Sequence, residues 1–140
     1  MAIEHTFAMI KPDAVAAKHA GEIISMIEKN GFEILRMQKG QLSKEMAETF
    51  YNVHKDRPFF KELVDFVTSG PVIIMALERE GAIKAWRDLM GSTNPADAAE
   101  GTVRKQFGTS IGHNASHGSD APETAGFELA LFFGRPADEQ

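Results

Sequence analysis

The segment Asn114–Asp120 (NASHGSD) contains the residues best suited to chemistry. It sets one histidine, His117, among small residues, and Gly118 leaves room for a bulky group to reach the ring. Asp120 is a favoured N-cap residue and Glu123 lies three positions later, so we expect a capped helix to begin here. A histidine beside a helix N-terminus can meet an anion such as phosphate, and a neutral imidazole is a competent nucleophile. A histidine in a turn can equally be structural, so this motif alone leaves both interpretations open.

Several cations are spaced along the chain as a polyphosphate site would require. Lys11 follows the first apolar stretch, Arg87 lies in a predicted helix, and Arg104 lies in the loop-rich segment after it. Isolated cations are usually solvated surface residues. Taken together with Thr93, Asn114 and the histidine, however, forked arginine donors and a lysine point charge indicate a site for phosphate oxygens.

Composition restricts the class of protein. The chain has 140 residues, a net charge of −5 and no cysteine, which fits one domain over residues 1–140 and excludes disulfides and thiol catalysis. The acidic balance disfavours a general nucleic-acid binder. No apolar run is long enough to span a membrane, and the N-terminus lacks the features of a signal peptide. We therefore expect a cytoplasmic protein that does not interact with membranes.

Hydrophobic periodicity predicts the elements that must position these residues. Strands are expected over 3–10, 32–42 and 71–77, and the last of these is the most apolar and should be central. Proline and aspartate after Lys11 should end the first strand. Helices are expected over 21–30, 43–54, 59–68 and 81–90, with Ser43 capping the second and Gly31 ending the first.

The region 91–117 is expected to be mainly loop, with helical turns near 96–100 and 103–107. Long irregular segments in compact domains are often functional. A closing element follows over 121–133, and the pattern of 127–133 fits a helix or a strand equally well. With a closing strand, the order becomes βαββαβ. This order predicts an α+β, ferredoxin-like fold: a four-stranded antiparallel sheet with helices on one face and a long loop-rich insertion before the histidine.

Short motifs in a fixed order carry a resemblance to one family. They are Thr6–Ala14, Tyr51–His54, Arg57–Phe60, Ser69–Pro71, Arg87–Gly91, Thr93–Pro95, Gly101–Arg104 and Asn114–Asp120. In this order they resemble the signature segments of the nucleoside diphosphate kinases, and the similarity extends over nearly the whole chain. Two positions differ from the expected pattern: Ser116 replaces a branched apolar residue, and Phe127 replaces a polar one. Both concern packing or subunit contacts.

The resemblance implies a phosphotransferase that moves the γ-phosphoryl group of a nucleoside triphosphate to a nucleoside diphosphate in a ping-pong reaction. It makes His117 the nucleophile, with a pros-phosphohistidine as the intermediate. Ser119 and Glu128 would support that histidine, and Tyr51 would line the site. The nucleotide would be held through its phosphates by Lys11, Arg87, Thr93 and Arg104, through its ribose by Asn114 and Lys11, and through its base by Phe59.

The resemblance also implies ligands and assembly. Mg²⁺ would bridge the nucleotide phosphates, and the protein itself would supply no metal site. The partners would be nucleoside di- and triphosphates such as ATP and GDP, with no specific nucleic acid. A homo-oligomer built from dimers is expected, and the short polar tail Gly134–Gln140 could decide between a dimer, a tetramer and a hexamer.

Two other functions fit parts of the sequence. His113 and His117 have the spacing of paired metal ligands, with Asp120 beyond, but that spacing requires a helix and the glycines here argue against one. A ferredoxin-like domain can also be a ligand-binding or RNA-binding module. The acidic balance and the single tyrosine disfavour an aromatic RNA platform.

Overall fold

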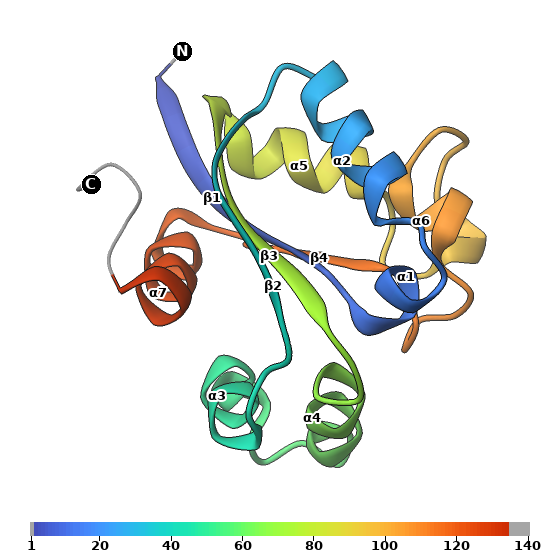
Figure 1. The fold of residues 1–140 in the computed structure, drawn as a ribbon, viewed down its shortest axis with the longest axis vertical. Helices are drawn as coiled ribbons and strands as arrows, with labels where there is room; N and C mark the ends of the chain where they lie inside the picture. The colour runs from blue at the N-terminus through green and yellow to red at the C-terminus, as the bar shows by residue number, and fades with distance from the viewer. Residues whose placement is uncertain (1, 135–140) are drawn as a thin grey trace.

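A four-stranded sheet forms the centre of the fold (Figure 1). The computed structural model describes residues 2–134. The strands are β1 (Ile3–Ile10), β2 (Glu33–Gly40), β3 (Val72–Glu80) and β4 (Ser116–Gly118). They lie in the order β2-β3-β1-β4, and every pairing is antiparallel. This confirms the predicted ferredoxin-like sheet, and the apolar strand β3 is an interior strand, as expected.

Helices pack against both faces of the sheet, whereas the sequence predicted one covered face. The α-helices are α1 (Pro12–Ala16), α2 (Ala20–Lys29), α3 (Lys44–Phe50), α4 (Phe60–Val67), α5 (Ala82–Met90), α6 (Val103–Phe107) and α7 (Pro122–Phe133). Two short 3₁₀ turns, η1 (Asn52–His54) and η2 (Pro95–Asp97), complete the set. Ala8 and Ile10 pack with α2 and α5, while the alternate residues Phe7 and Met9 pack with α3, α4 and α7. Both faces are buried because β1 and β3 are apolar at consecutive positions, the pattern of a doubly covered strand.

Most predicted helix ends match the structure. The Ser43 side chain accepts a hydrogen bond from the backbone N–H of Met46, and Gly31 follows α2 with a φ of +84°. The predicted helix over 43–54 is interrupted, because Tyr51 leaves the helical conformation after Phe50 and the chain continues as η1. The structure also adds α1, which begins at Pro12, where the missing N–H of proline costs nothing.

The closing strand lies earlier in the chain than the sequence indicated. Residues 127–133 belong to α7, and the strand that completes the sheet is β4, which contains His117. At three residues, β4 is too short to show alternation, and it pairs with β1 alone among the described strands. In α7, Ala125, Leu129 and Phe132 recur at helical spacing, and the Phe132 ring stacks on Phe7 at 4.7 Å.

The segment between α5 and β4 is loop-rich, as predicted, and contains η2 and α6. It lies with α6 at one end of the molecule, on the side opposite α7 (Figure 1). The tail beyond Gly134, which the sequence linked to assembly, falls outside the described residues. Within residues 2–134, no helix is long and apolar enough to cross a membrane.

Candidate active site

A cavity of about 720 Å³ collects nearly all the residues that the sequence assigned to a site. Its volume falls in the range of small-molecule sites. The predicted site residues that line it are Lys11, Tyr51, Phe59, Arg87, Thr93, Arg104, Asn114, His117 and Glu128. Ser119 does not line the cavity, but it contacts Glu128 directly. The fold therefore brings together residues from α5, the loop-rich segment, β4 and α7 with residues that lie just after β1, just after α3 and just before α4.

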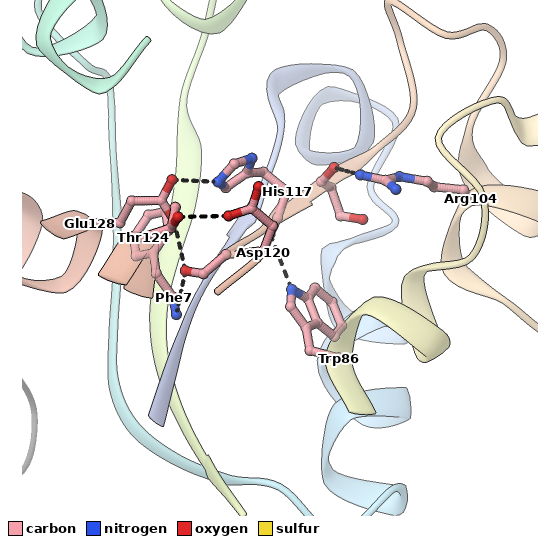
Figure 2. Close-up of polar contacts among 9 residues, drawn as sticks. Phe7, Trp86, Arg104, His117, Asp120, Thr124 and Glu128 are labelled. Carbon is pink, nitrogen blue, oxygen red and sulfur yellow. Dashed lines mark hydrogen bonds and ion pairs between the residues drawn. The ribbon is translucent and has the colours of Figure 1, made fainter. Parts of the chain in front are cut away.

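A chain of hydrogen bonds fixes the ring of His117 (Figure 2). Its Nε2 lies 3.0 Å from Oε2 of Glu128, a side chain that is only 5% exposed. The Ser119 hydroxyl donates to Oε1 of Glu128 at 2.7 Å and accepts from the backbone N–H of Phe7 at 3.3 Å. A carboxylate only accepts, so Nε2 carries the proton and Nδ1 is left with a free lone pair.

His117 lies in a strand, although the sequence placed it in a turn. Its ring meets the edge of Phe50 at 4.8 Å, and its backbone carbonyl accepts a hydrogen bond of 3.1 Å from the Trp86 indole (Figure 2). A Cβ at Gly118 would lie 2.4 Å from Trp86. The bulky group for which Gly118 leaves room is therefore the indole, which packs against β4. Sequence reasoning assigned no such role to Trp86.

The predicted capping box at the start of α7 does not form. The helix begins at Pro122, and its N-cap residue, Ala121, makes no side-chain capping bond. The Asp120 carboxylate instead accepts a hydrogen bond of 2.6 Å from the Thr124 hydroxyl (Figure 2). Proline is favoured in the first helical turn, so it moves the helix start past Asp120 and separates that residue from Glu123.

Lys11 is buried in the cavity wall, where its cation is destabilised. Its Nζ donates to Oδ1 of Asn114 at 2.9 Å, and Nδ2 of Asn114 donates to the carbonyl of Thr93 at 3.0 Å. Burial, and then the nearby charge of Arg104, lower the pKa of Lys11 to about 8, against an opposing effect of Asp13. An anion in the cavity would raise this pKa again and so stabilise the cation. This is the behaviour expected of a lysine that binds phosphate.

Arg104 is held rigidly before any ligand arrives. Its Nη1 donates to the carbonyl of Gly91 at 3.1 Å, and Nη2 donates to the carbonyl of Ser116 at 2.9 Å. Within the described part of the chain, its buried Nε has no partner. Burial and the positive charge of Arg87 lower the pKa of Arg104 to about 10. A guanidinium braced in this way loses little conformational freedom when it binds an anion.

The opposite wall of the cavity is apolar. Phe59, at the N-cap of α4, is 42% exposed, and Ile111 from the loop-rich segment lines the same cavity. The ring of His113 leans on Phe66 with 4.4 Å between ring centres. Glu62 and His113 are exposed polar residues that line the same cavity. Sequence reasoning missed Glu62, which belongs to no motif that it used, and considered His113 only as a metal ligand.

The remaining candidates are Tyr51 and the histidine pair His113 and His117. Burial and the charge of Glu128 raise the pKa of the Tyr51 hydroxyl, so this group stays protonated. His113 and His117 do not share a helical face, because a loop and a strand contain them. Residues 2–134 hold no cluster of three or more possible metal ligands. The metal-site interpretation therefore lacks the helix that it needs.

The family profile of nucleoside diphosphate kinases matches residues 4–137. The chain belongs to this family. It is 59% identical over 131 residues to the nucleoside diphosphate kinase of Syntrophotalea carbinolica, covering 94% of this chain and 96% of that protein. It is 56% identical over 133 residues to the enzyme of Bradyrhizobium diazoefficiens, covering 95% of each chain.

Solved nucleoside diphosphate kinases share the fold. The Aquifex aeolicus enzyme superposes with a TM-score of 0.93 at 42% identity, covering 94% of this chain and 96% of that one. The Halobacterium salinarum enzyme, solved in complex with CDP, gives 0.89 at 42% identity, with 94% and 88% covered. The chain is thus a nucleotide-binding phosphotransferase with nucleoside diphosphate kinase activity, and the RNA-module interpretation is set aside.

Proposed function

We propose that His117 carries the phosphoryl group between two nucleotides that use the same cavity in turn. The lone pair of Nδ1 attacks the γ-phosphorus of a nucleoside triphosphate, the bond to the β-phosphate oxygen breaks, and the nucleoside diphosphate leaves. A second diphosphate then attacks the phosphohistidine in the reverse sense. The observation that carries this proposal is the Ser119–Glu128–His117 chain, which occupies Nε2 and leaves Nδ1 free.

The tautomer follows from the contact with Glu128. A buried carboxylate next to Nε2 favours the proton on that nitrogen and stabilises the positive charge that the ring gains when Nδ1 is phosphorylated. Because Ser119 and the Phe7 backbone hold the carboxylate, the ring needs no reorientation during transfer. We therefore assign the intermediate to Nδ1, the pros nitrogen.

The cations supply charge rather than covalent chemistry. Phosphoryl transfer depends mainly on positioning and on stabilising charge on the phosphate oxygens. Lys11, Arg87 and Arg104 line the cavity together with Thr93, and we assign the phosphates to these four residues. We assign the ribose to Asn114 and Lys11, which already contact each other, and we propose that the protonated Tyr51 hydroxyl lines the site beside them.

The base would stack on Phe59. Its ring is partly exposed on the apolar wall and lines the same cavity as the residues assigned to the phosphates. Aromatic stacking tolerates every base, because each base has a π-face. This arrangement suits an enzyme that accepts many nucleotides.

Mg²⁺ fits this site as an ion carried by the nucleotide. Three of the four residues assigned to the phosphates are cations, and the described residues form no group of three or more acidic or histidine ligands. The ion would therefore be coordinated mainly by phosphate oxygens and water, which is usual for magnesium. When bound, it would neutralise phosphate charge and fix the phosphate conformation.

We further propose that residues 1–140 act as one domain and assemble as a homo-oligomer built from dimers. Strand β2 is an edge strand that exposes the apolar Leu35 and Met37, and an exposed apolar edge is suited to pairing with a second copy. The cytoplasm, which holds the nucleotide pools that such an enzyme would balance, is the compartment that we propose.

Steady-state kinetics with ATP and GDP test the proposal. We expect GTP and ADP to form in equal amounts and double-reciprocal plots at several ATP concentrations to be parallel, as a ping-pong reaction requires. His117→Asn should abolish turnover, whereas His19→Asn, a substitution outside the cavity, should not change it. Intersecting plots would require both nucleotides to be bound at once and would contradict the mechanism.

A further inference from the structure

Ala115 has a backbone conformation that alanine rarely adopts. Its φ is +75°, and the residue is fully buried. In the described part of the chain, Lys18 is the one other non-glycine residue with a positive φ, and it is exposed in a loop. An L-residue in this region is strained unless its surroundings hold it there. The strain lies between Asn114 and β4, within two residues of His117.

Both polar groups of the Ala115 backbone are held by the segment that follows β1. The N–H of Lys11 donates to the Ala115 carbonyl at 2.8 Å. The N–H of Ala115 donates to Oδ2 of Asp13 at 3.0 Å. A backbone hydrogen bond and a charge-assisted bond thus hold one residue from opposite sides, which is how a strained conformation is maintained.

Among the described residues, the Ala115 N–H is the one hydrogen-bond donor that contacts the Asp13 carboxylate. Its second oxygen, Oδ1, is buried and accepts no hydrogen bond from residues 2–134. A partly buried carboxylate with one bond is costly to keep for packing alone. Its negative charge also raises the pKa of Lys11 and so favours the lysine cation.

The backbone conformation of Ala115 sets the positions of two site residues, Asn114 and His117. Rotation of its backbone would redirect the chain on both sides. On one side, Asn114 would lose its contacts with Lys11 Nζ and with the Thr93 carbonyl. On the other side, β4 and the His117 ring would move relative to Glu128. A displacement of about 1 Å at a reacting group can lower a rate on the order of 10²-fold.

We propose that Asp13 is a positioning residue, which holds Ala115 in its left-handed conformation and thereby places Asn114 and His117 for the reaction. This inference rests on the roles proposed above for Asn114 and His117. Asp13 does not line the cavity, so it acts through the backbone of Ala115 and touches no reacting atom.

Four variants test this proposal: Asp13→Ala, Asp13→Asn, Ala115→Gly and the double variant Asp13→Ala/Ala115→Gly. Asparagine keeps an oxygen that can accept the Ala115 N–H, and glycine adopts a positive φ without strain. Glu28→Ala, which removes an exposed carboxylate from α2, is the matched charge control. Each variant is assayed at pH 7, below the pKa of Lys11, with ordinary acceptors and with acceptors that lack one ribose hydroxyl. Urea unfolding reports stability separately.

Asp13→Ala should lower kcat/KM on the order of 10²-fold and reduce the preference for acceptors with both ribose hydroxyls, because Asn114 is displaced. Asp13→Asn should recover most of the loss, and Ala115→Gly should recover at least about tenfold in the Asp13→Ala background, because glycine removes the strain. If Asp13→Ala is unfolded, Asp13→Glu, which displaces the carboxylate by one methylene, should show the same rescue by Ala115→Gly.

Wild-type kinetics in Asp13→Ala would overturn the inference and leave the proposed function intact. So would a double variant that regains the urea midpoint but not the rate, because Asp13 would then affect the rate by a route other than the conformation of Ala115. Failure of the wild type to transfer phosphate would instead overturn the proposed function together with this inference.

Discussion

At the scale of single residues, the site combines the proposed nucleophile, His117, with side chains that the protein orders before the substrate arrives. His117 is fixed through Nε2, Arg104 is fixed through two backbone carbonyls, and Lys11 is fixed through Asn114. Each of these side chains would otherwise lose rotamer freedom in the transition state. Preorganised donors need no rearrangement during the reaction, which makes them effective in phosphoryl transfer.

Glu128→Gln should slow transfer without preventing it. The amide removes the charge that supports the His117 ring and leaves the tautomer unspecified. Loss of one buried, charge-assisted partner is expected to cost about 1–3 kcal/mol, roughly 5- to 150-fold in kcat/KM. Rapid-quench measurement of His117 phosphorylation checks this, and the exposed Glu123→Gln is the control. Wild-type rates in Glu128→Gln would exclude the supporting role.

The rate should fall at alkaline pH because of Lys11. Its lowered pKa, about 8, means that the cation is present below this pH and is lost as pH rises through it. With adenine nucleotides, kcat/KM should decline about tenfold per pH unit above this value. The decline in kcat should begin at higher pH, since bound phosphate favours the cation. In Lys11→Arg the decline should move beyond the measured range. An unchanged alkaline limb in that variant would assign it to another group.

At the scale of elements, the apolar wall proposed for the base is built by α4 and the loop-rich segment. The cations proposed for the phosphates come from α5, α6 and the residue that follows β1. Substrate binding as proposed would thus join parts of the chain that pack on different faces of the sheet. Glu62 and His113 line the same cavity as Phe59 and are exposed, so water can solvate both side chains. Hydrated groups discriminate weakly between bases.

Broad base specificity is therefore predicted. Nucleotides of all five common bases should turn over, with kcat/KM spread over about two orders of magnitude, on the order of 3 kcal/mol. Phe59→Ala should weaken every substrate, and purines most, because they stack over more area. Kinetics with the five diphosphates check this, with Val53→Ala, another exposed cavity residue, as the control. Discrimination of many thousandfold for one base would require a hydrogen-bonded readout instead.

The elements also show which parts of the structure the sequence could predict. The helices α2 and α5 were predicted because their apolar positions repeat at helical spacing, and the strands β1 and β3 because each contains an apolar run. The three-residue β4 was missed, since its existence depends on pairing with β1. The site residues could be predicted because they belong to short sequence motifs, and the fold brings them together around one cavity. Asp13 and Trp86 were missed because their roles arise from contacts with backbone far away in sequence.

At the scale of the whole molecule, the edge of the sheet remains available for assembly. Strand β2 pairs only with β3 among the described strands and exposes Leu35 and Met37, which are 39% and 54% exposed. Lysine and arginine on the same strand limit uncontrolled pairing. A specific contact with a second copy would bury these apolar residues without removing the cavity from solvent.

Met37→Asp should weaken the homo-oligomer. A carboxylate buried at an interface without a partner opposes association. Analytical ultracentrifugation should show wild-type oligomers and a shift toward monomers in this variant. Ile3→Asp, which places the same charge on an exposed apolar position of β1, should not shift the distribution. Identical sedimentation of wild type and Met37→Asp would place the interface elsewhere.

The identity of the phosphorylated atom tests the account most directly. The protein is incubated with ATP and Mg²⁺, freed of nucleotide and examined by phosphorus NMR and peptide mass spectrometry under alkaline conditions, which preserve phosphohistidine. We predict one phosphate per chain, on Nδ1 of His117, which added GDP removes completely as GTP. Phosphate on Nε2, phosphate on another residue, or transfer to GDP without any phosphoprotein would contradict the mechanism.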